Sequence, residues 1–139
     1  MTKLLQIKVD KVPSNAHEFL KVWKNVLKSP ADRYTFLLRV GSQQLGHIFC
    51  SEISFGLLGE MLRVMSDGYQ ETADGSELLA VLEALSSANR FSLSLQFLDN
   101  TELTACSQLL QRLHQTFADD QASQQSANRV ISLMSVYGA

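Results

Sequence analysis

Residues 54–68 are apolar around most of the circumference that they would have as a helix. Their apolar side chains fall into two stripes at spacings of three and four residues: Phe55, Leu58, Leu62 and Met65, and Leu57, Met61 and Val64. These spacings are typical of a helix, and a helix on a domain surface needs only one such stripe. We therefore predict a helix capped by Ser54, ending near Asp67-Gly68 and lying in the middle of a domain.

Two glycines, Gly56 and Gly59, fall inside this predicted helix. Glycine costs roughly 1 kcal/mol relative to alanine in a helix interior, and less in the first turn, where Gly56 would lie. Close packing of a neighbouring helix would explain why they are present. The neighbours must then also be helices.

Helix signals do recur on both sides of this segment. Ahead of it, Pro13-Ser14 opens a helix with apolar residues at helical spacing, Ser29-Pro30-Ala31-Asp32 starts a second, Gly41 ends that one, and residues 42–49 suit a short third. Behind it, Asp74 with Glu77 and Asp99 with Glu102 have the spacing of capping boxes. The last long helix carries the stripe Leu103, Cys106, Leu110, Leu113 and Phe117. The chain is predicted to be all-α, a compact bundle of about six to eight antiparallel helices with short loops.

Residues 90–98 are the ambiguous part of this pattern. Their apolar side chains alternate, as in a half-buried strand, yet a lone strand would have no partner among helices. As a helix capped by Asn89, the segment has two apolar faces: Phe91, Leu95 and Leu98 on one, Leu93 and Phe97 on the other. We expect the first face to enter the core. The second then needs either a neighbouring helix or another protein.

The two ends differ from the middle. Residues 1–12 are predicted to be an extended or disordered leader, 13–117 the helical domain, and 118–139 a polar linker followed by a short amphipathic helix. That last helix carries Val130, Ile131, Met134 and Tyr137. It either folds back on the body or serves as a ligand for another protein.

Composition narrows the class of protein. The 139 residues are 45% hydrophobic and 19% charged, which suits one compact domain. Residues 1–40 carry a net charge of +5 and residues 41–139 a net charge of −7. The acidic total and the lack of clustered arginines argue against nucleic-acid binding, and no apolar run is long enough for a membrane span. Without a secretion signal, we expect a cytoplasmic protein whose two cysteines are reduced, small core residues.

The candidates for chemistry do not combine into a site. His17, His47 and His114 are scattered, and Cys50 and Cys106 lie far apart with no metal-ligand spacing. We therefore predict no enzymatic activity, no catalytic residues, no metal site and no cofactor. Binding through apolar surface remains as the expected role.

An ordered set of residues carries a family resemblance over about residues 13–117. The set is Pro13, Phe19 and Trp23, then Tyr34 and Leu37-Leu38, Leu45 and Phe49, Leu57-Leu58, and Arg90-Phe91 with Leu93 and Phe97-Leu98. It resembles the C-terminal domain of RNA polymerase II-associated protein 3, which also occurs in sperm-associated antigen 1. Residues 55–62 and 90–95 are most similar to the branch that includes coiled-coil domain-containing protein 103.

The resemblance implies an all-helical, non-catalytic adaptor domain for chaperone-assisted complex assembly. In the polymerase-associated branch the domain docks on RuvB-like AAA+ ATPases. The other branch is implicated in assembling dynein arms of cilia, and it self-associates. The family's ATPase contact implies partner-binding roles for Leu93 and Phe97, with Arg90 beside them, and Leu93 replaces a methionine of the polymerase-associated branch. The expected partners are RuvB-like ATPases or dynein assembly factors, in the cytoplasm or at the axoneme.

A second hypothesis is a self-associating structural module that binds the axoneme or microtubules without contacting the ATPases. Its basic residues within 1–40 would face acidic tubulin, and its terminal helix would pair between subunits. The two hypotheses place the partner surface on different parts of the chain.

Overall fold

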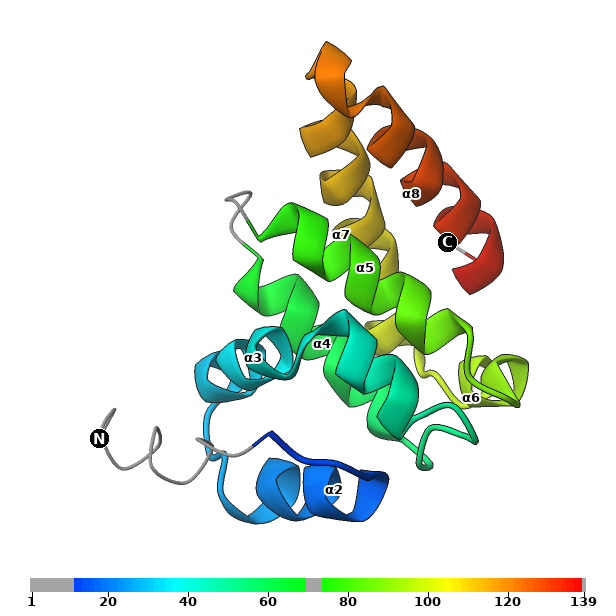
Figure 1. Cartoon of the computed structure of the whole chain (residues 1–139). Coiled ribbons are helices and arrows are strands. Elements are labelled where there is room, and N and C mark those ends of the chain that lie inside the picture. Colours follow the sequence, from blue (N-terminus) through cyan, green and yellow to red (C-terminus); the bar gives the residue numbers. More distant parts are fainter. Residues whose placement is uncertain (1–11, 70–73, 139) are drawn as a thin grey trace.

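The computed structural model describes residues 12–69 and 74–138, and the regular structure within them is entirely helical. In chain order the elements are α2 (Ala16–Asn25), α3 (Pro30–Ile48), α4 (Leu57–Gly68), α5 (Gly75–Ser86), α6 (Phe91–Gln96), α7 (Asn100–Ala118), the 3-10 turn η1 (Gln121–Ser123) and α8 (Gln124–Tyr137) (Figure 1). The prediction of an all-α bundle is confirmed. Most of the predicted leader, residues 1–11, and part of the predicted loop before α5, residues 70–73, lie outside the described residues.

Helix α4 lies at the centre of the bundle, as its two apolar stripes predict. It packs against α3 on one side and α7 on the other. Eight of its twelve residues are buried: Leu57, Leu58, Gly59, Met61, Leu62, Val64, Met65 and Ser66. Burial on both sides explains why the sequence has so few polar positions here.

Helices α2 and α3 cover one face of this core. Helix α3 begins as the sequence predicts, whereas α2 begins at Ala16 with Asn15 as its N-cap, just after the predicted start at Pro13-Ser14. The Ser29 side chain accepts a hydrogen bond from the backbone N–H of Asp32, at 3.2 Å. Gly41, at φ 84° and ψ 161°, interrupts α3 and separates two helical halves. Glycine adopts such positive φ values without a steric penalty. The helix end that the sequence predicts at Gly41 is therefore present as a kink between two helical halves.

The predicted capping box at the start of α5 does not form. Asp74 makes no side-chain cap; its Oδ2 instead accepts from the Tyr34 hydroxyl, at 3.1 Å. The Glu77 carboxylate accepts from the backbone N–H of Ser42, at 2.9 Å. Both acids therefore bind α3, where the break at Gly41 leaves an N–H to be satisfied.

Trp23 ties α2 to the first turn of α4. It is fully buried and stacks on Phe19, with 5.4 Å between ring centroids. Its Nε1 donates to Glu60 Oε1 at 2.8 Å, and the Arg33 guanidinium lies 4.9 Å from the indole ring centroid. These contacts with α2 and α3 therefore fix the position of the first turn of α4.

Helices α7 and α8 form a long antiparallel pair (Figure 1). The predicted capping box is present, because Asp99 accepts from the Glu102 N–H while Glu102 Oε1 accepts from the Asp99 N–H. Leu103, predicted to face inward, is 40% exposed, and Leu109 is buried on the core side instead. The segment predicted to be a polar linker contains the turn η1, in which Asp120 accepts from the N–H of Ala122.

The buried thiol of Cys106 makes the free energy of unfolding depend on pH in the alkaline range. The side chain is 1% exposed, and burial raises the pKa of its thiol from 9.0 to about 11. The unfolded chain therefore loses this proton first, so the stabilisation is complete below pH 9.0 and is lost as the pH rises toward 11. We expect the thiol to account for a fall of about 2–3 kcal/mol in the free energy of unfolding over that range.

Urea unfolding at a series of pH values tests this expectation. Cys106→Ala should show a weaker fall between pH 9 and 11 than the wild type. Cys50→Ala is the matched control, because Cys50 is exposed, contrary to the prediction of two core cysteines. Equal pH dependence in the wild type and Cys106→Ala would contradict the assignment.

Candidate protein-interaction groove

Residues 90–98 fold as the helical alternative, forming α6. Its N-cap is Arg90, at φ 61°, and not the predicted Asn89. The backbone N–H of Asn89 donates to the carbonyl of Cys50 at 3.0 Å, so Asn89 holds the preceding loop. The left-handed turn at Arg90 then directs the short helix across the start of α4.

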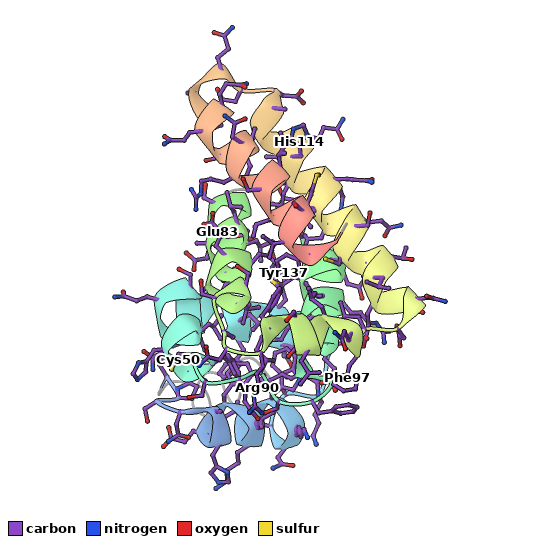
Figure 2. The ribbon with its side chains drawn as sticks, turned by 90° about the vertical axis from the view of Figure 1, so that its right-hand side faces the viewer. Cys50, Glu83, Arg90, Phe97, His114 and Tyr137 are labelled. Carbon is purple, nitrogen blue, oxygen red and sulfur yellow. The ribbon has the colours of Figure 1, made fainter. Side chains whose placement is uncertain are left out.

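The two apolar faces of α6 have different surroundings. Phe91 is 7% exposed and meets Tyr137 edge to face, with ring centroids 5.0 Å apart. Leu95 and Leu98 are partly buried against the core. On the other face Leu93 is 45% and Phe97 52% exposed, and Figure 2 shows Phe97 at the edge of the molecule. No helix of the described domain covers these two side chains.

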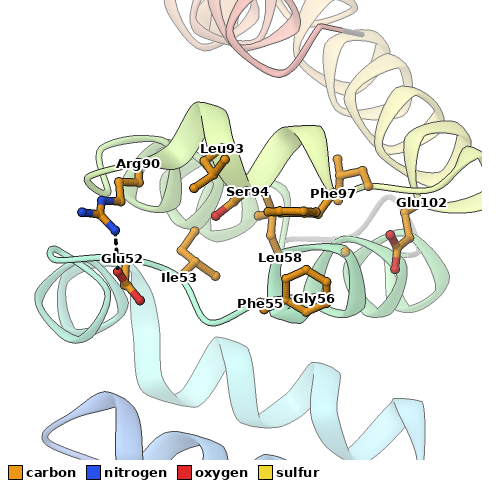
Figure 3. Close-up of a pocket in the computed structure, with 12 residues that line it drawn as sticks. Glu52, Ile53, Phe55, Gly56, Leu58, Arg90, Leu93, Ser94, Phe97 and Glu102 are labelled. Carbon is orange, nitrogen blue, oxygen red and sulfur yellow. Dashed lines mark ion pairs between the residues drawn. The ribbon is translucent and has the colours of Figure 1, made fainter.

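A groove of about 180 Å³ lies beside this exposed face. One wall consists of Leu93 and Ser94 on α6 with Phe97 and Leu98 just after it. The other consists of Ile53, Phe55 and Gly56 just before α4 with Leu58 and Gly59 in its first turn (Figure 3). Ile53 and Leu58 are buried, so they form an apolar floor. The sequence places these two walls about 40 residues apart, and only the fold brings them together.

Phe55 is the groove residue that the sequence patterns misplace. The predicted cap at Ser54 is wrong: α4 begins at Leu57, and Gly56, at φ 79°, is its N-cap. Phe55 therefore lies outside the helix and is 81% exposed, rather than belonging to a core stripe. Its ring meets that of Phe97, with centroids 4.7 Å apart and planes at 61°. Gly56 itself was the available signal, since glycine often marks a left-handed position.

Charged side chains stand at the two ends of the groove. At one end Arg90 Nη1 and Glu52 Oε1 lie 3.8 Å apart, and both side chains are largely exposed (Figure 3). At the other end lies Glu102, held by its capping box. A Cβ on Gly59 would collide with the Glu102 carboxylate, so glycine leaves room for this side chain of α7 against α4. This is the close packing that the two glycines predicted, at Gly59 only.

Helix α8 packs against the core-facing side of α6 through Tyr137. Tyr137 lies inside the domain (Figure 2) and is 2% exposed. Its hydroxyl donates a hydrogen bond to the carbonyl of Leu82 at 2.6 Å. Burial raises the pKa of this phenol well above its ordinary value, which keeps it a hydrogen-bond donor. Arg129 forms a two-pronged ion pair with Glu83 of α5. The terminal helix therefore docks on the domain, one of the two possibilities that the sequence left open.

The structure brings the three predicted partner-binding residues together, since Arg90, Leu93 and Phe97 all line the groove. The described basic residues that the second hypothesis uses lie outside the groove.

Lys21, Lys24 and Lys28 are exposed on and just after α2. Within residues 12–69 and 74–138, no group of three or more His, Cys, Asp or Glu side chains is placed to hold a metal ion. In the same residues, no helix combines the length and apolar character needed to cross a bilayer.

Comparisons with known proteins identify the family of this chain. A family model described as the potential Monad-binding region of RPAP3 matches residues 12–103, more than half of the chain. Dynein axonemal assembly factor 19 of mouse is 34% identical over 113 residues, covering 81% of this chain and 47% of that protein. The zebrafish protein of the same name is 35% identical over 101 residues, covering 73% of this chain and 40% of the relative. The chain thus spans less than half the length of these relatives.

A solved structure shows the same fold. The NMR structure of the C-terminal domain of the human RPAP3 protein superposes with a TM-score of 0.70 at 18% identity, covering 86% of this chain and 89% of that one. RNA polymerase II-associated protein 3 of chicken is 23% identical over 94 residues, covering 68% of this chain and 14% of that protein. The resemblance seen in the sequence is confirmed: this chain belongs to the family described as the potential Monad-binding region of RPAP3.

Proposed function

We propose that this chain is a protein-binding adaptor domain in dynein arm assembly that docks on RuvB-like AAA+ ATPases through the groove beside α6. The observation that carries the proposal is the exposure of Leu93 and Phe97 on a helix whose opposite face is held in the core. Related proteins are named as dynein axonemal assembly factors, which supports the assembly role. The proposal places the domain in the cytoplasm or at the axoneme.

The chemistry of the groove suits recognition rather than catalysis. Its floor and both walls are mainly apolar, and its ionisable side chains are confined to the two ends. A catalytic site requires polar groups that converge on one reacting atom. Burying Leu93 and Phe97 against a partner would supply roughly 3–6 kcal/mol before the costs of association. Contributions of this size are typical of the few residues that dominate an interface.

A pull-down with purified RuvB-like ATPases tests the proposal. We expect Leu93→Glu and Phe97→Glu each to weaken binding by at least ~30-fold, since each places a charge in an apolar contact worth about 2 kcal/mol or more. Both positions are about half exposed, so the fold should survive, which circular dichroism and thermal melting would verify.

Ile131→Glu is the matched control for this pull-down. Ile131 is 51% exposed, as Phe97 is 52% exposed, but it lies on α8 and does not line the groove. It should bind like the wild type. Undiminished binding by a well-folded Leu93→Glu/Phe97→Glu double variant would rule out the groove as the ATPase contact.

The self-association hypothesis enters the same experiment as an outcome. While α8 stays docked, burying Val130 and Leu133 and anchoring Tyr137, it could pair between subunits only through its outer face, where Ile131 and Val136 are exposed. Light scattering of the full chain, with a truncation at Gln125 beside it, would detect such pairing. A dimer that dissociates on truncation, together with microtubule pelleting and no ATPase capture, would favour that hypothesis instead.

A further inference from the structure

Phe55 adds an anchor to the groove that the family resemblance did not assign. Among the described residues no other large apolar side chain exposes so great a fraction of its surface. The ring is nevertheless positioned, because Gly56 fixes the turn beneath it and Phe97 contacts it edge to face. An edge-to-face pair leaves the outer ring faces free for a third apolar group. Phe55 therefore extends the exposed ridge of Leu93 and Phe97 across the groove.

The arrangement of Leu93, Phe97 and Phe55 indicates which mode of peptide recognition suits the groove. Adding a strand requires a free sheet edge, and the described residues form no sheet. Leu93 lies on α6 and Phe97 is the C-cap residue of that helix, four positions later, so their side chains lie about one helical turn apart on the same wall of the groove. Such a ridge packs between the side-chain ridges of another helix. A helix laid along α6 would place its apolar stripe between this ridge and Phe55.

The ends of the groove add a charge preference. Glu102 uses Oε1 in its capping box, while its Oε2 accepts no hydrogen bond from the described residues. Glu52 lies at the opposite end, and its 3.8 Å pair with Arg90 joins two side chains that are 61% and 72% exposed. Exposed pairs of this kind are weak and exchange partners readily. Two carboxylates, with only one cation among the lining residues, favour a basic ligand.

We propose that the groove receives an amphipathic helix that packs its apolar stripe on Leu93, Phe97 and Phe55 and directs Lys or Arg side chains to Glu102 and Glu52. This inference rests on the proposed function only in taking the groove as a protein-binding surface. It names the chemical class of the segment that occupies the groove, whichever protein carries it.

Synthetic peptides test the class directly on the full chain. The test uses three peptides of about 18 residues, because shorter helices are marginal in water. All three carry the same number of charged side chains. One carries a leucine stripe with Lys and Arg flanks, the second the same stripe with Glu flanks, and the third is a basic proline-rich sequence. Fluorescence anisotropy should show binding of the first alone, weakening at least several-fold between about 50 and 500 mM salt because added ions screen exposed charges. Equal binding of the acidic helix, preference for the proline-rich peptide, or no binding at all would overturn the proposal.

Substitutions then locate the contact. Phe55→Ala should weaken binding of the basic helix at least tenfold, with little change in melting temperature because the side chain is 81% exposed. Glu102→Gln should weaken it about three- to tenfold while keeping the capping box, since glutamine also serves at that position. Asp119→Asn is the matched control, because Asp119 lies at the other end of α7, roughly 26 Å from Glu102 at 1.5 Å per residue. Unchanged affinity in both Phe55→Ala and Glu102→Gln would contradict the proposed contacts.

The two proposals fail in distinguishable ways. Peptide binding that depends on Phe55, without capture of the ATPases, would reject the ATPase partner and keep the helical, basic ligand class. ATPase capture that depends on Phe97 but not on Phe55, Glu102 or salt would keep the proposed function and reject this inference.

Discussion

Gly68→Ala is expected to lower the free energy of unfolding by about 3 kcal/mol, near the upper end of the cost of overpacking a core. Gly68 is the last residue of α4, and a Cβ there would lie 2.8 Å from Cε1 of Tyr34 and closer still to Cγ and Cδ1. The Tyr34 ring is 9% exposed, and its hydroxyl is bound to Asp74. The ring therefore cannot turn aside without losing that hydrogen bond.

Thermal melting and urea unfolding would measure this loss, and Gly46→Ala provides the comparison. Gly46 is also helical, but a Cβ there would lie 3.4 Å from the Cβ of Ala84, close to ordinary contact. We expect its effect to stay within about 1 kcal/mol, because alanine favours the helix by a similar amount. Tyr34→Leu combined with Gly68→Ala should cost less than the sum of the two single changes, since the clash requires both groups. Strict additivity would show that the ring is not the obstacle.

Arg112→Met is expected to cost about 2–4 kcal/mol, because three hydrogen bonds from a charged donor are lost together. Arg112 lies on α7, and its Nη1 donates to the carbonyl of Tyr69 at 3.1 Å. Its Nη2 donates to the carbonyl of Ser66 and to that residue's Oγ, the latter at 3.2 Å. The guanidinium thus satisfies carbonyls at the end of α4 that no further helical turn could reach.

Arg63→Met separates this role from the general effect of removing an arginine. Arg63 is exposed on α4, so its substitution should change stability by less than about 0.5 kcal/mol. Arg112→Lys should recover little, because an ammonium lacks the planar fork that reaches two carbonyls at once. Chemical denaturation of the three variants would measure the difference. Equal stability of the Met variants at 112 and 63 would mean that α4 and α7 do not depend on this link.

Much of the helical framework could be predicted because its signals are local. The caps at Ser29 and Asp99 depend on side chains within three residues of the N–H groups that they satisfy. The central position of α4 follows from its apolar stripes, whichever helices cover it. Asp74 and Glu77 show the limit of such signals, since the same spacing was present and the acids bound α3 instead. A local cap competes with any donor that folding brings nearby, and the sequence does not show that donor.

The groove was predictable on one wall only. The two-faced pattern of residues 90–98 indicated Leu93 and Phe97 as a face that needs either a neighbouring helix or another protein, and both side chains are exposed in the described domain. Phe55 was assigned to a core stripe because helical spacing continues through it, although the helix begins only at Leu57, after its N-cap Gly56. Helical spacing alone does not distinguish an apolar residue just inside a helix from one just outside it; the local sign of this boundary was Gly56.

The sequence by itself determined the helical class, the central helix and the family, because periodicity, caps and an ordered set of residues are all contained in short stretches of chain. Only the tertiary structure decided that Phe55 and Phe97, 42 residues apart, form one surface with Glu52 and Glu102 at its ends. The physical reason is that burial is a property of neighbours in space. Phe91 is covered because Tyr137 of α8 packs against it, while Phe97, the C-cap residue of the same short helix, is left about half exposed.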